Sequence, residues 1–135
     1  MKQRFKFFYS LTLLFAVSSI CLLAHDTIKV ACVGNSITYG IGVTHRATDA
    51  YPAQLQRLLG PHYVVGNFGK PSATLLRKGN LPYMEQEEFQ KALAFRADYV
   101  IIHLGVNDTD PSAWPNYRDD FVRDYLALIQ AFRQA

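Results

Sequence analysis

The chain has few residues that could cross-link it or hold a metal ion. Its 135 residues include two cysteines, Cys21 and Cys32. Neither cysteine has a histidine or acid at the spacing of a zinc site, so we expect no metal and no organic cofactor. Cys32 lies in an apolar run, where a lone cysteine is usually a small core residue. We therefore expect a fold without an intrachain disulfide once a leader containing Cys21 is removed.

The chain also lacks net charge outside its first residues. The formal charge is +3, and Lys2, Arg4 and Lys6 account for it. From residue 25 onward the remaining eleven basic residues balance the eleven acidic ones. A neutral body offers no electrostatic surface for nucleic acid or for anionic membranes. We therefore expect neither as a partner, and membrane contact only through an uncleaved leader.

The first 24 residues have the pattern of an export signal. A basic start is followed by the uncharged, mostly apolar segment Phe7–Ala24, and Ala24 is a small residue at a plausible cleavage point. We predict a signal peptide over residues 1–24, a domain over residues 25–135, and a secreted or periplasmic location. The alternative is a retained anchor, because ~18 apolar residues approach the lower limit for a spanning helix.

The rest of the sequence alternates between strand-like and helix-like segments. Short apolar runs predict strands at Ile28–Val33, Tyr63–Val65 and Tyr99–Leu104. Helical spacing predicts helices at Ala50–Leu59, Glu85–Phe95 and from Tyr117 to the terminus, with Asp108–Pro115 as a loop. This order indicates an α/β fold, with a parallel sheet between helices. Three strands are fewer than the usual five or six, so we expect a domain cut short.

Each predicted strand ends in a loop that carries glycine with serine or asparagine. These loops are Gly34–Gly40, Gly66–Thr74 and Leu104–Asp108. The carboxyl ends of parallel strands meet at one edge, where ligands bind. The Ser36 hydroxyl could attack an acyl carbon, and the Asn107 amide could stabilise the resulting oxyanion. Ser36 could also be only a turn or cap residue, and we expect Asp108 to be structural.

Three blocks of sequence resemble the SGNH, or GDSL-type, esterases and lipases. They are Gly34-Asn35-Ser36-Ile37-Thr38, the segment from Asn67-Phe68-Gly69 to Ala73-Thr74-Leu75-Leu76, and His103-Leu104-Gly105-Val106-Asn107-Asp108. The resemblance implies a three-layer α/β/α sandwich with a flavodoxin-like parallel sheet whose C-terminal strands are missing. It also implies Ser36 as nucleophile and Asn107 as an oxyanion donor.

The sequence departs from the family pattern at two positions in these blocks. Asn35 stands where the family usually has aspartate. Ser72 stands at the place of the glycine whose backbone N–H donates to the oxyanion. Any residue except proline keeps that N–H, so Ser72 can remain a donor. The loop conformation is the open question, because glycine tolerates backbone angles that serine disfavours.

The family's last block, Asp-x-x-His, has no counterpart in these residues. The histidines His25, His45, His62 and His103 are preceded three positions earlier by Leu22, Gly42, Leu59 and Val100. A serine without its base stays protonated at neutral pH. We therefore expect these residues alone to hydrolyse little p-nitrophenyl acetate.

Several functions fit the resemblance. The first is a serine esterase of small acyl groups, with O-acetyl groups on carbohydrate as substrate, similar to secreted sialate O-acetylesterases. The alternatives are a truncated, non-catalytic fragment or binding module, and a lysophospholipase or thioesterase of the same family. A nucleotide-binding flavodoxin-like domain is disfavoured, because Gly34–Gly40 lacks both glycine-rich phosphate signatures.

The remaining polar and aromatic residues near these blocks have ordinary interpretations. We expect His103 to be an interior or rim histidine and His45 a solvated loop residue. Trp114 could pack in the core or stack on a sugar ring. The cations Lys70, Arg77 and Lys78 form a solvated face beside the second block.

Overall fold

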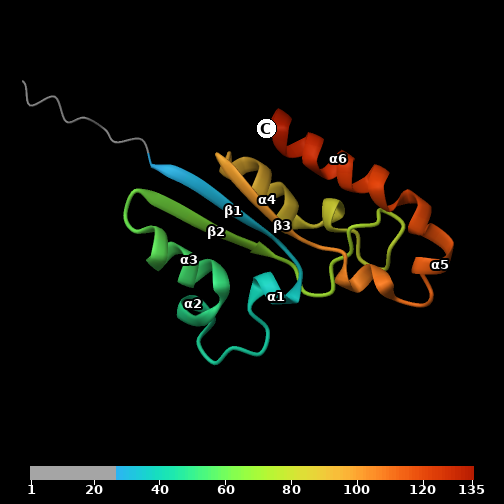
Figure 1. Ribbon diagram of the computed structural model, residues 1–135, viewed down its shortest axis with the longest axis horizontal. Coiled ribbons are helices and arrows are strands. Elements are labelled where there is room, and N and C mark those ends of the chain that lie inside the picture. The colour runs from blue at the N-terminus through green and yellow to red at the C-terminus, as the bar shows by residue number, and fades with distance from the viewer. Residues whose placement is uncertain (1–26) are drawn as a thin grey trace, which may run out of the picture.

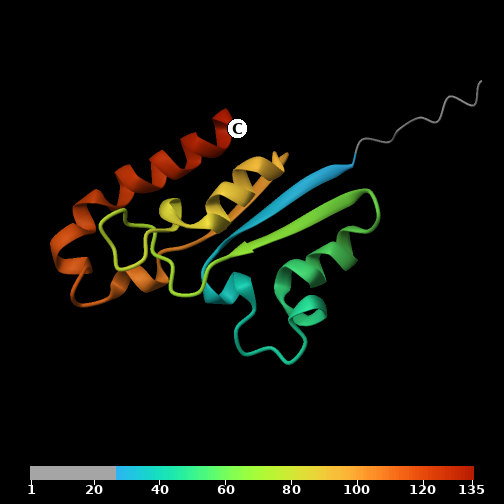
Figure 2. The same ribbon diagram turned by 180° about the vertical axis from the view of Figure 1, so that it is seen from behind.

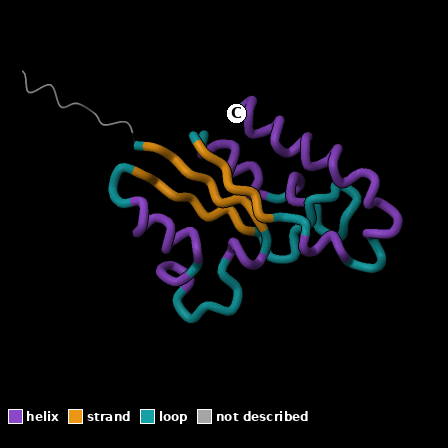
Figure 3. The backbone as a smooth tube through the Cα atoms, viewed as in Figure 1, coloured by secondary structure: helices purple, strands orange, loops and turns teal. Residues whose placement is uncertain are grey.

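The structure is a computed structural model that describes residues 27–135. The predicted signal segment lies outside the described residues. Three parallel strands form the sheet: β1 (Ile28–Gly34), β2 (Tyr63–Gly69) and β3 (Tyr99–His103). Their spatial order is β2-β1-β3, which is how a flavodoxin-like sheet begins (Figure 3). The predicted α/β fold with a parallel sheet is therefore confirmed.

Helices cover both faces of this sheet, as Figures 1 and 2 show from opposite sides. On one face lie α2 (Arg46–Asp49) and α3 (Tyr51–Leu59), and on the other lie α4 (Glu87–Phe95) and α6 (Phe121–Gln134). The shorter elements are α1 (Ser36–Tyr39), α5 (Trp114–Tyr117), and the 3₁₀ turns η1 (Tyr83–Glu85), η2 (Val106–Thr109) and η3 (Arg118–Asp120). Within residues 27–135, every helix is too short or too polar to span a bilayer.

The main core lies between the sheet and the α4–α6 layer. Ala31 and Val33 of β1 contribute one face of the strand, and they cluster with Phe89 of α4 and Leu128 of α6. Side chains alternate across a strand, so Val30 faces the opposite layer, where it lines a hollow with Leu55 of α3. Cys32 is fully buried, as its apolar surroundings predict.

Several predicted element boundaries are wrong. The second strand does not end at Val65 but continues to Gly69, because it pairs with β1 along its whole length. The predicted loop Asp108–Pro115 contains the second half of the turn η2 and the start of α5. The last helix begins at Phe121 rather than Tyr117. Tertiary pairing and short turns decided these boundaries, and local composition does not report either.

Candidate active site

The three strand ends lie side by side at one edge of the sheet. In the strand register, Gly34 at the end of β1 stands opposite Gly69 on one side and His103 on the other. The backbone N–H of Lys70 donates to the Gly34 carbonyl at 2.8 Å, which ties the second loop to the first. The structure therefore places the loops bearing Ser36, Ser72 and Asn107 on one rim, as the strand order predicted.

Ser36 is the first residue of the short helix α1. Asn35 is the cap of this helix, and its Oδ1 accepts a hydrogen bond from the Ile37 N–H at 3.0 Å. At the other end Gly40, in a left-handed conformation, donates its N–H to the Ser36 carbonyl. Asn35, not Ser36, thus supplies the capping side chain. Within residues 27–135, the half-buried Ser36 makes no hydrogen bond through its Oγ.

Two glycines allow this helix to sit directly against the strand ends. A Cβ atom at Gly34 would overlap Thr38 Oγ1 and lie 2.8 Å from the His103 carbonyl oxygen. A Cβ atom at Gly69 would overlap the backbone nitrogen of Tyr39. The Tyr39 nitrogen belongs to the backbone, so it cannot rotate away as a side chain could. Both glycines are therefore needed to hold Ser36 close to the second and third loops.

Ser72 adopts a backbone conformation that glycine would adopt more easily. Its φ is 65°, in the left-handed region, and it lies in the turn closed by the Ala73 N–H donating to the Lys70 carbonyl at 3.1 Å. The serine therefore keeps the glycine-like turn at some conformational cost. Its exposed position and its retained N–H are compatible with donation to a ligand at the rim.

Asn107 joins the third loop to the second. Its Nδ2 donates to the carbonyl of Ala73, the residue after Ser72, at 2.9 Å. An amide nitrogen carries two hydrogens, so one remains for a ligand. The hydrogen bond to Ala73 fixes the orientation of this amide beside the Ser72 turn. This is the arrangement that a preorganised oxyanion donor needs.

Two buried carboxylates hold the second loop in place. Asp108 is fully buried and accepts from the N–H groups of Leu75 at 2.9 Å and Leu76 at 2.6 Å. Asp124 of α6 accepts from the Arg77 N–H at 2.9 Å. The structural role expected for Asp108 is confirmed. No sequence motif pointed to Asp124, although an acid on the otherwise apolar stripe of α6 was a usable signal.

Residues 32–135 match the GDSL-like Lipase/Acylhydrolase family. This match takes in most of the chain and all three rim loops. The chain belongs to this family. The resemblance drawn from the three sequence blocks is therefore confirmed, and with it membership in a family of carboxylic ester hydrolases.

One curated protein similar in sequence to this GDSL-like chain is an acetylxylan esterase from Xylanibacter ruminicola. The two are 47% identical over 117 residues, which is 87% of this chain and 24% of the relative. The chain thus spans about a quarter of that relative's length. No solved structure matches this GDSL-like chain.

The other candidate residues of the GDSL-like chain lie in packed, exposed or ion-paired positions that indicate ordinary structural roles. Trp114 is half-buried and packs edge-on against Phe121, with ring centroids 5.6 Å apart, which favours the packing interpretation. His45 precedes α2 and is exposed, and His103 ends β3 at the rim. Lys70 is paired with Glu88 at 3.3 Å. Within residues 27–135, no three His, Cys, Asp or Glu side chains are grouped as metal ligands.

Proposed function

We propose that the protein is a secreted serine esterase that removes O-acetyl groups from carbohydrate. One observation carries the proposal: hydrogen bonds join the three strand-end loops into one rim that holds Ser36, Ser72 and Asn107. The match to the GDSL-like family supports the reaction type. The name of the acetylxylan esterase relative supports an acetyl ester on a saccharide.

In this mechanism the Ser36 hydroxyl attacks the acetyl carbonyl carbon. A base takes the hydroxyl proton, and the carbonyl oxygen becomes an oxyanion. The free N–H of the Asn107 amide and the backbone N–H groups of Ser72 and Ser36 donate to that oxygen. The sugar hydroxyl then leaves with a proton, and water hydrolyses the acetyl-serine to acetate. We assign the base to no residue of this chain, because no Asp-x-x-His occurs in it.

The hydrogen bonds around Ser36 support its role as nucleophile. The capping bond of Asn35 and the two close-packed glycines fix the serine backbone. Its hydroxyl is left without a hydrogen bond to residues 27–135. The hydroxyl of a serine with only a structural role would more often form a hydrogen bond in a helix cap or turn. Here the side chain of Asn35 forms the capping hydrogen bond instead.

The test is acetate release by the full-length protein that contains these residues. Acetylated xylo-oligosaccharide and p-nitrophenyl acetate are the substrates, and Ser36→Ala is the variant. We expect a loss of kcat of about 10⁴-fold or more, with the thermal midpoint unchanged. Ser112→Ala is the matched control, because Ser112 is exposed and its hydroxyl is bonded only to Asp110. Retained turnover in Ser36→Ala would refute the assignment.

The same assay separates the alternatives within the family. A lysophospholipase or thioesterase would release product from lysophosphatidylcholine or an acyl thioester faster than from acetylated saccharide. A binding module would retain saccharide affinity and release acetate from none of these substrates. Proteomic detection of a mature N-terminus at residue 25 in the extracellular or periplasmic fraction would test the proposed export and the 1–24 signal segment.

A further inference from the structure

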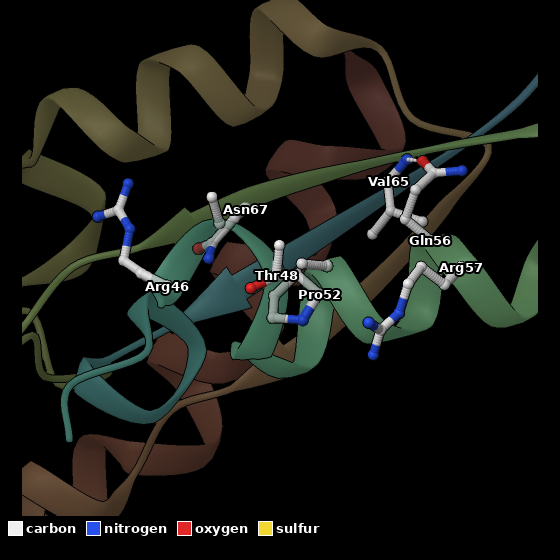
Figure 4. Close-up of a pocket in the computed structure, with 9 residues that line it drawn as sticks. Arg46, Thr48, Pro52, Gln56, Arg57, Val65 and Asn67 are labelled. Carbon is white, nitrogen blue, oxygen red and sulfur yellow. Dashed lines mark hydrogen bonds between the residues drawn. The ribbon is translucent and has the colours of Figure 1, made fainter. Parts of the chain in front are cut away.

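A hollow of about 420 Å³ lies beside the candidate active site, between α2, α3 and β2 (Figure 4). Arg46, Thr48, Pro52, Arg57 and Asn67 are among the residues that line it. Its volume falls in the range of sites that bind small molecules. None of the proposed catalytic residues lines this hollow, so any ligand in it makes contacts separate from the chemistry.

The lining of the hollow is positively charged. Arg46 and Arg57 both line it, whereas no aspartate or glutamate does. Within residues 27–135, neither arginine forms a salt bridge, in contrast to Arg123, which pairs with Asp120 at 2.9 Å. Asp49, the acid closest to Arg46 in the sequence, accepts from the Thr48 hydroxyl at 2.8 Å and from the His45 N–H. The two guanidinium groups thus keep their hydrogen-bonding capacity for a ligand.

The other polar side chains of the hollow are already used by the fold. Gln56 donates to the carbonyls of Gly60 and Tyr63 and accepts from the Val65 N–H. Asn67 accepts from the Gly69 N–H and donates to the Tyr39 carbonyl. These two amides line the hollow, and most of their hydrogen-bonding groups are already paired within the protein. A ligand would therefore be recognised chiefly by the two arginines, which suit carboxylate groups.

The hollow is also connected to the nucleophile helix. The Arg46 guanidinium lies 4.0 Å from the centroid of the Tyr39 ring. Tyr39 is the last residue of α1, the helix that begins with Ser36. Stacking of this kind restrains the guanidinium and leaves its N–H edge free for a bidentate partner. A saccharide chain with an ester at Ser36 could therefore extend along α1 into the hollow.

We propose that this hollow is a subsite for an acidic sugar unit, with Arg46 and Arg57 binding uronic acid carboxylates. Figure 4 shows the two arginines toward opposite ends of the hollow, with Thr48 and Pro52 between them. That separation suits an extended saccharide better than one compact anion. The inference rests on the proposed function in taking saccharide as the substrate class, and it adds that the saccharide carries negative charge.

Binding of unacetylated ligands tests the subsite without any catalytic step. Isothermal titration of the full-length protein compares two xylo-oligosaccharides of equal length, one unbranched and one with two glucuronic acid branches. We expect the acidic ligand to bind about tenfold tighter, a difference of about 1.4 kcal/mol. Arg46→Gln and Arg57→Gln should each remove about half of that free-energy difference, and the double variant and high salt should remove most of it. Arg118→Gln is the matched control, because Arg118 is exposed and lies outside the hollow.

Titrations with two smaller anions show whether the hollow recognises a saccharide or any anion. Free glucuronate and inorganic phosphate should bind far more weakly than the branched oligosaccharide. Equal affinity for phosphate and for the branched ligand would overturn the inference in favour of a simple anion site. Equal affinity for neutral and acidic oligosaccharides would overturn it as well. Circular dichroism and thermal midpoints of the arginine variants show whether each remains folded.

A kinetic ratio tests the subsite during turnover. We expect kcat/KM for acetylated acidic oligosaccharide, relative to the neutral one, to fall about threefold in Arg46→Gln or Arg57→Gln and about tenfold in the double variant. The two proposals fail in different ways. Acid-selective binding without any acetate release would refute the esterase and leave the subsite standing. Acetate release without selectivity for acidic saccharide would refute only the subsite.

Discussion

Asp108 Oδ1 lies 2.6 Å from the backbone nitrogen of Leu76, and both residues are fully buried. Its other oxygen accepts from the Leu75 N–H, so one carboxylate spans two consecutive donors of the second loop. Asp108 directly follows Asn107, whose amide bonds to Ala73 in the same loop. The position of the proposed oxyanion donor and the position of the Ser72 turn are thus set by a single pair of neighbouring residues.

Replacing Asp108 with alanine should destabilise the fold. The change leaves two buried N–H groups without an acceptor, each costing about 1–3 kcal/mol. We expect the free energy of unfolding to fall by roughly 3 kcal/mol in urea denaturation, with acetate release also reduced. Asp119→Ala is the control, because the Asp119 side chain is 97% exposed. Equal stabilities of the two variants would contradict the stabilising role of the two Asp108 hydrogen bonds.

Asn107→Ala tests the oxyanion role. Loss of one such donor typically lowers kcat about 10²–10³-fold, and KM should change little because the donor acts mainly in the transition state. Steady-state kinetics of the full-length protein on p-nitrophenyl acetate measure both values. Asn116→Ala is the matched control, since Asn116 is exposed and its side chain bonds only to the Ser112 carbonyl. A rise in KM with kcat unchanged would point to a role in substrate binding.

Ser72→Gly should keep activity and slightly raise stability. The φ of 65° is unfavourable for serine and accessible to glycine, while the added freedom of the unfolded chain offsets part of the gain. We expect up to about 1 kcal/mol of added stability in urea denaturation. Ser72→Val should change stability in the opposite direction, because β-branched residues avoid positive φ. A stabilised Ser72→Val would show that this turn is not left-handed.

Gly69→Ala should disturb the nucleophile helix. The added Cβ would overlap the Tyr39 nitrogen and lie 2.7 Å from the Thr38 carbonyl carbon. We expect about 1–3 kcal/mol of lost stability in urea denaturation, together with reduced acetate release, because α1 must move. Gly42→Ala is the comparison for backbone strain alone, since Gly42 has a φ of 90° but its Cβ would meet no atom within 4 Å. Full activity in Gly69→Ala would mean that Ser36 tolerates displacement of its helix.

The half-buried Tyr51 should make stability sensitive to alkaline pH. Burial raises the pKa of Tyr51 from 10.0 to about 12. The folded state thus holds the phenol proton more tightly than the unfolded chain. This contribution is complete below pH 10 and is lost as the pH rises through 12. Urea midpoints from pH 9 to 12 should fall less steeply in Tyr51→Phe. Parallel curves would contradict the assignment.

The sequence predicted the centres of the strands and the position of the rim. An apolar, β-branched run such as that at the start of Ile28–Gly34 favours a buried strand, and the glycine after it ends the strand. Parallel strands put their carboxyl ends together, so the strand order alone predicted that the three loops would share one edge. The signal segment and the catalytic roles of Ser36, Ser72 and Asn107 stay predictions.

Other features depended on contacts between distant residues. The extension of β2 to Gly69 comes from pairing with β1, and the short helix α1 forms where Asn35 caps it against the β2 end. Neither a four-residue helix nor a strand rich in glycine has a strong local signal.

The sequence by itself determined the family, the alternation of strands and helices, and the residue types available for chemistry. These depend on local pattern and on motifs that the chain carries in order. Only the tertiary structure decided what holds those residues in place, namely the carboxylates of Asp108 and Asp124 on the second loop, and what lies beside them, namely the arginine-lined hollow. Hydrogen bonds between residues tens of positions apart and charges gathered from separate elements exist only once the chain has folded.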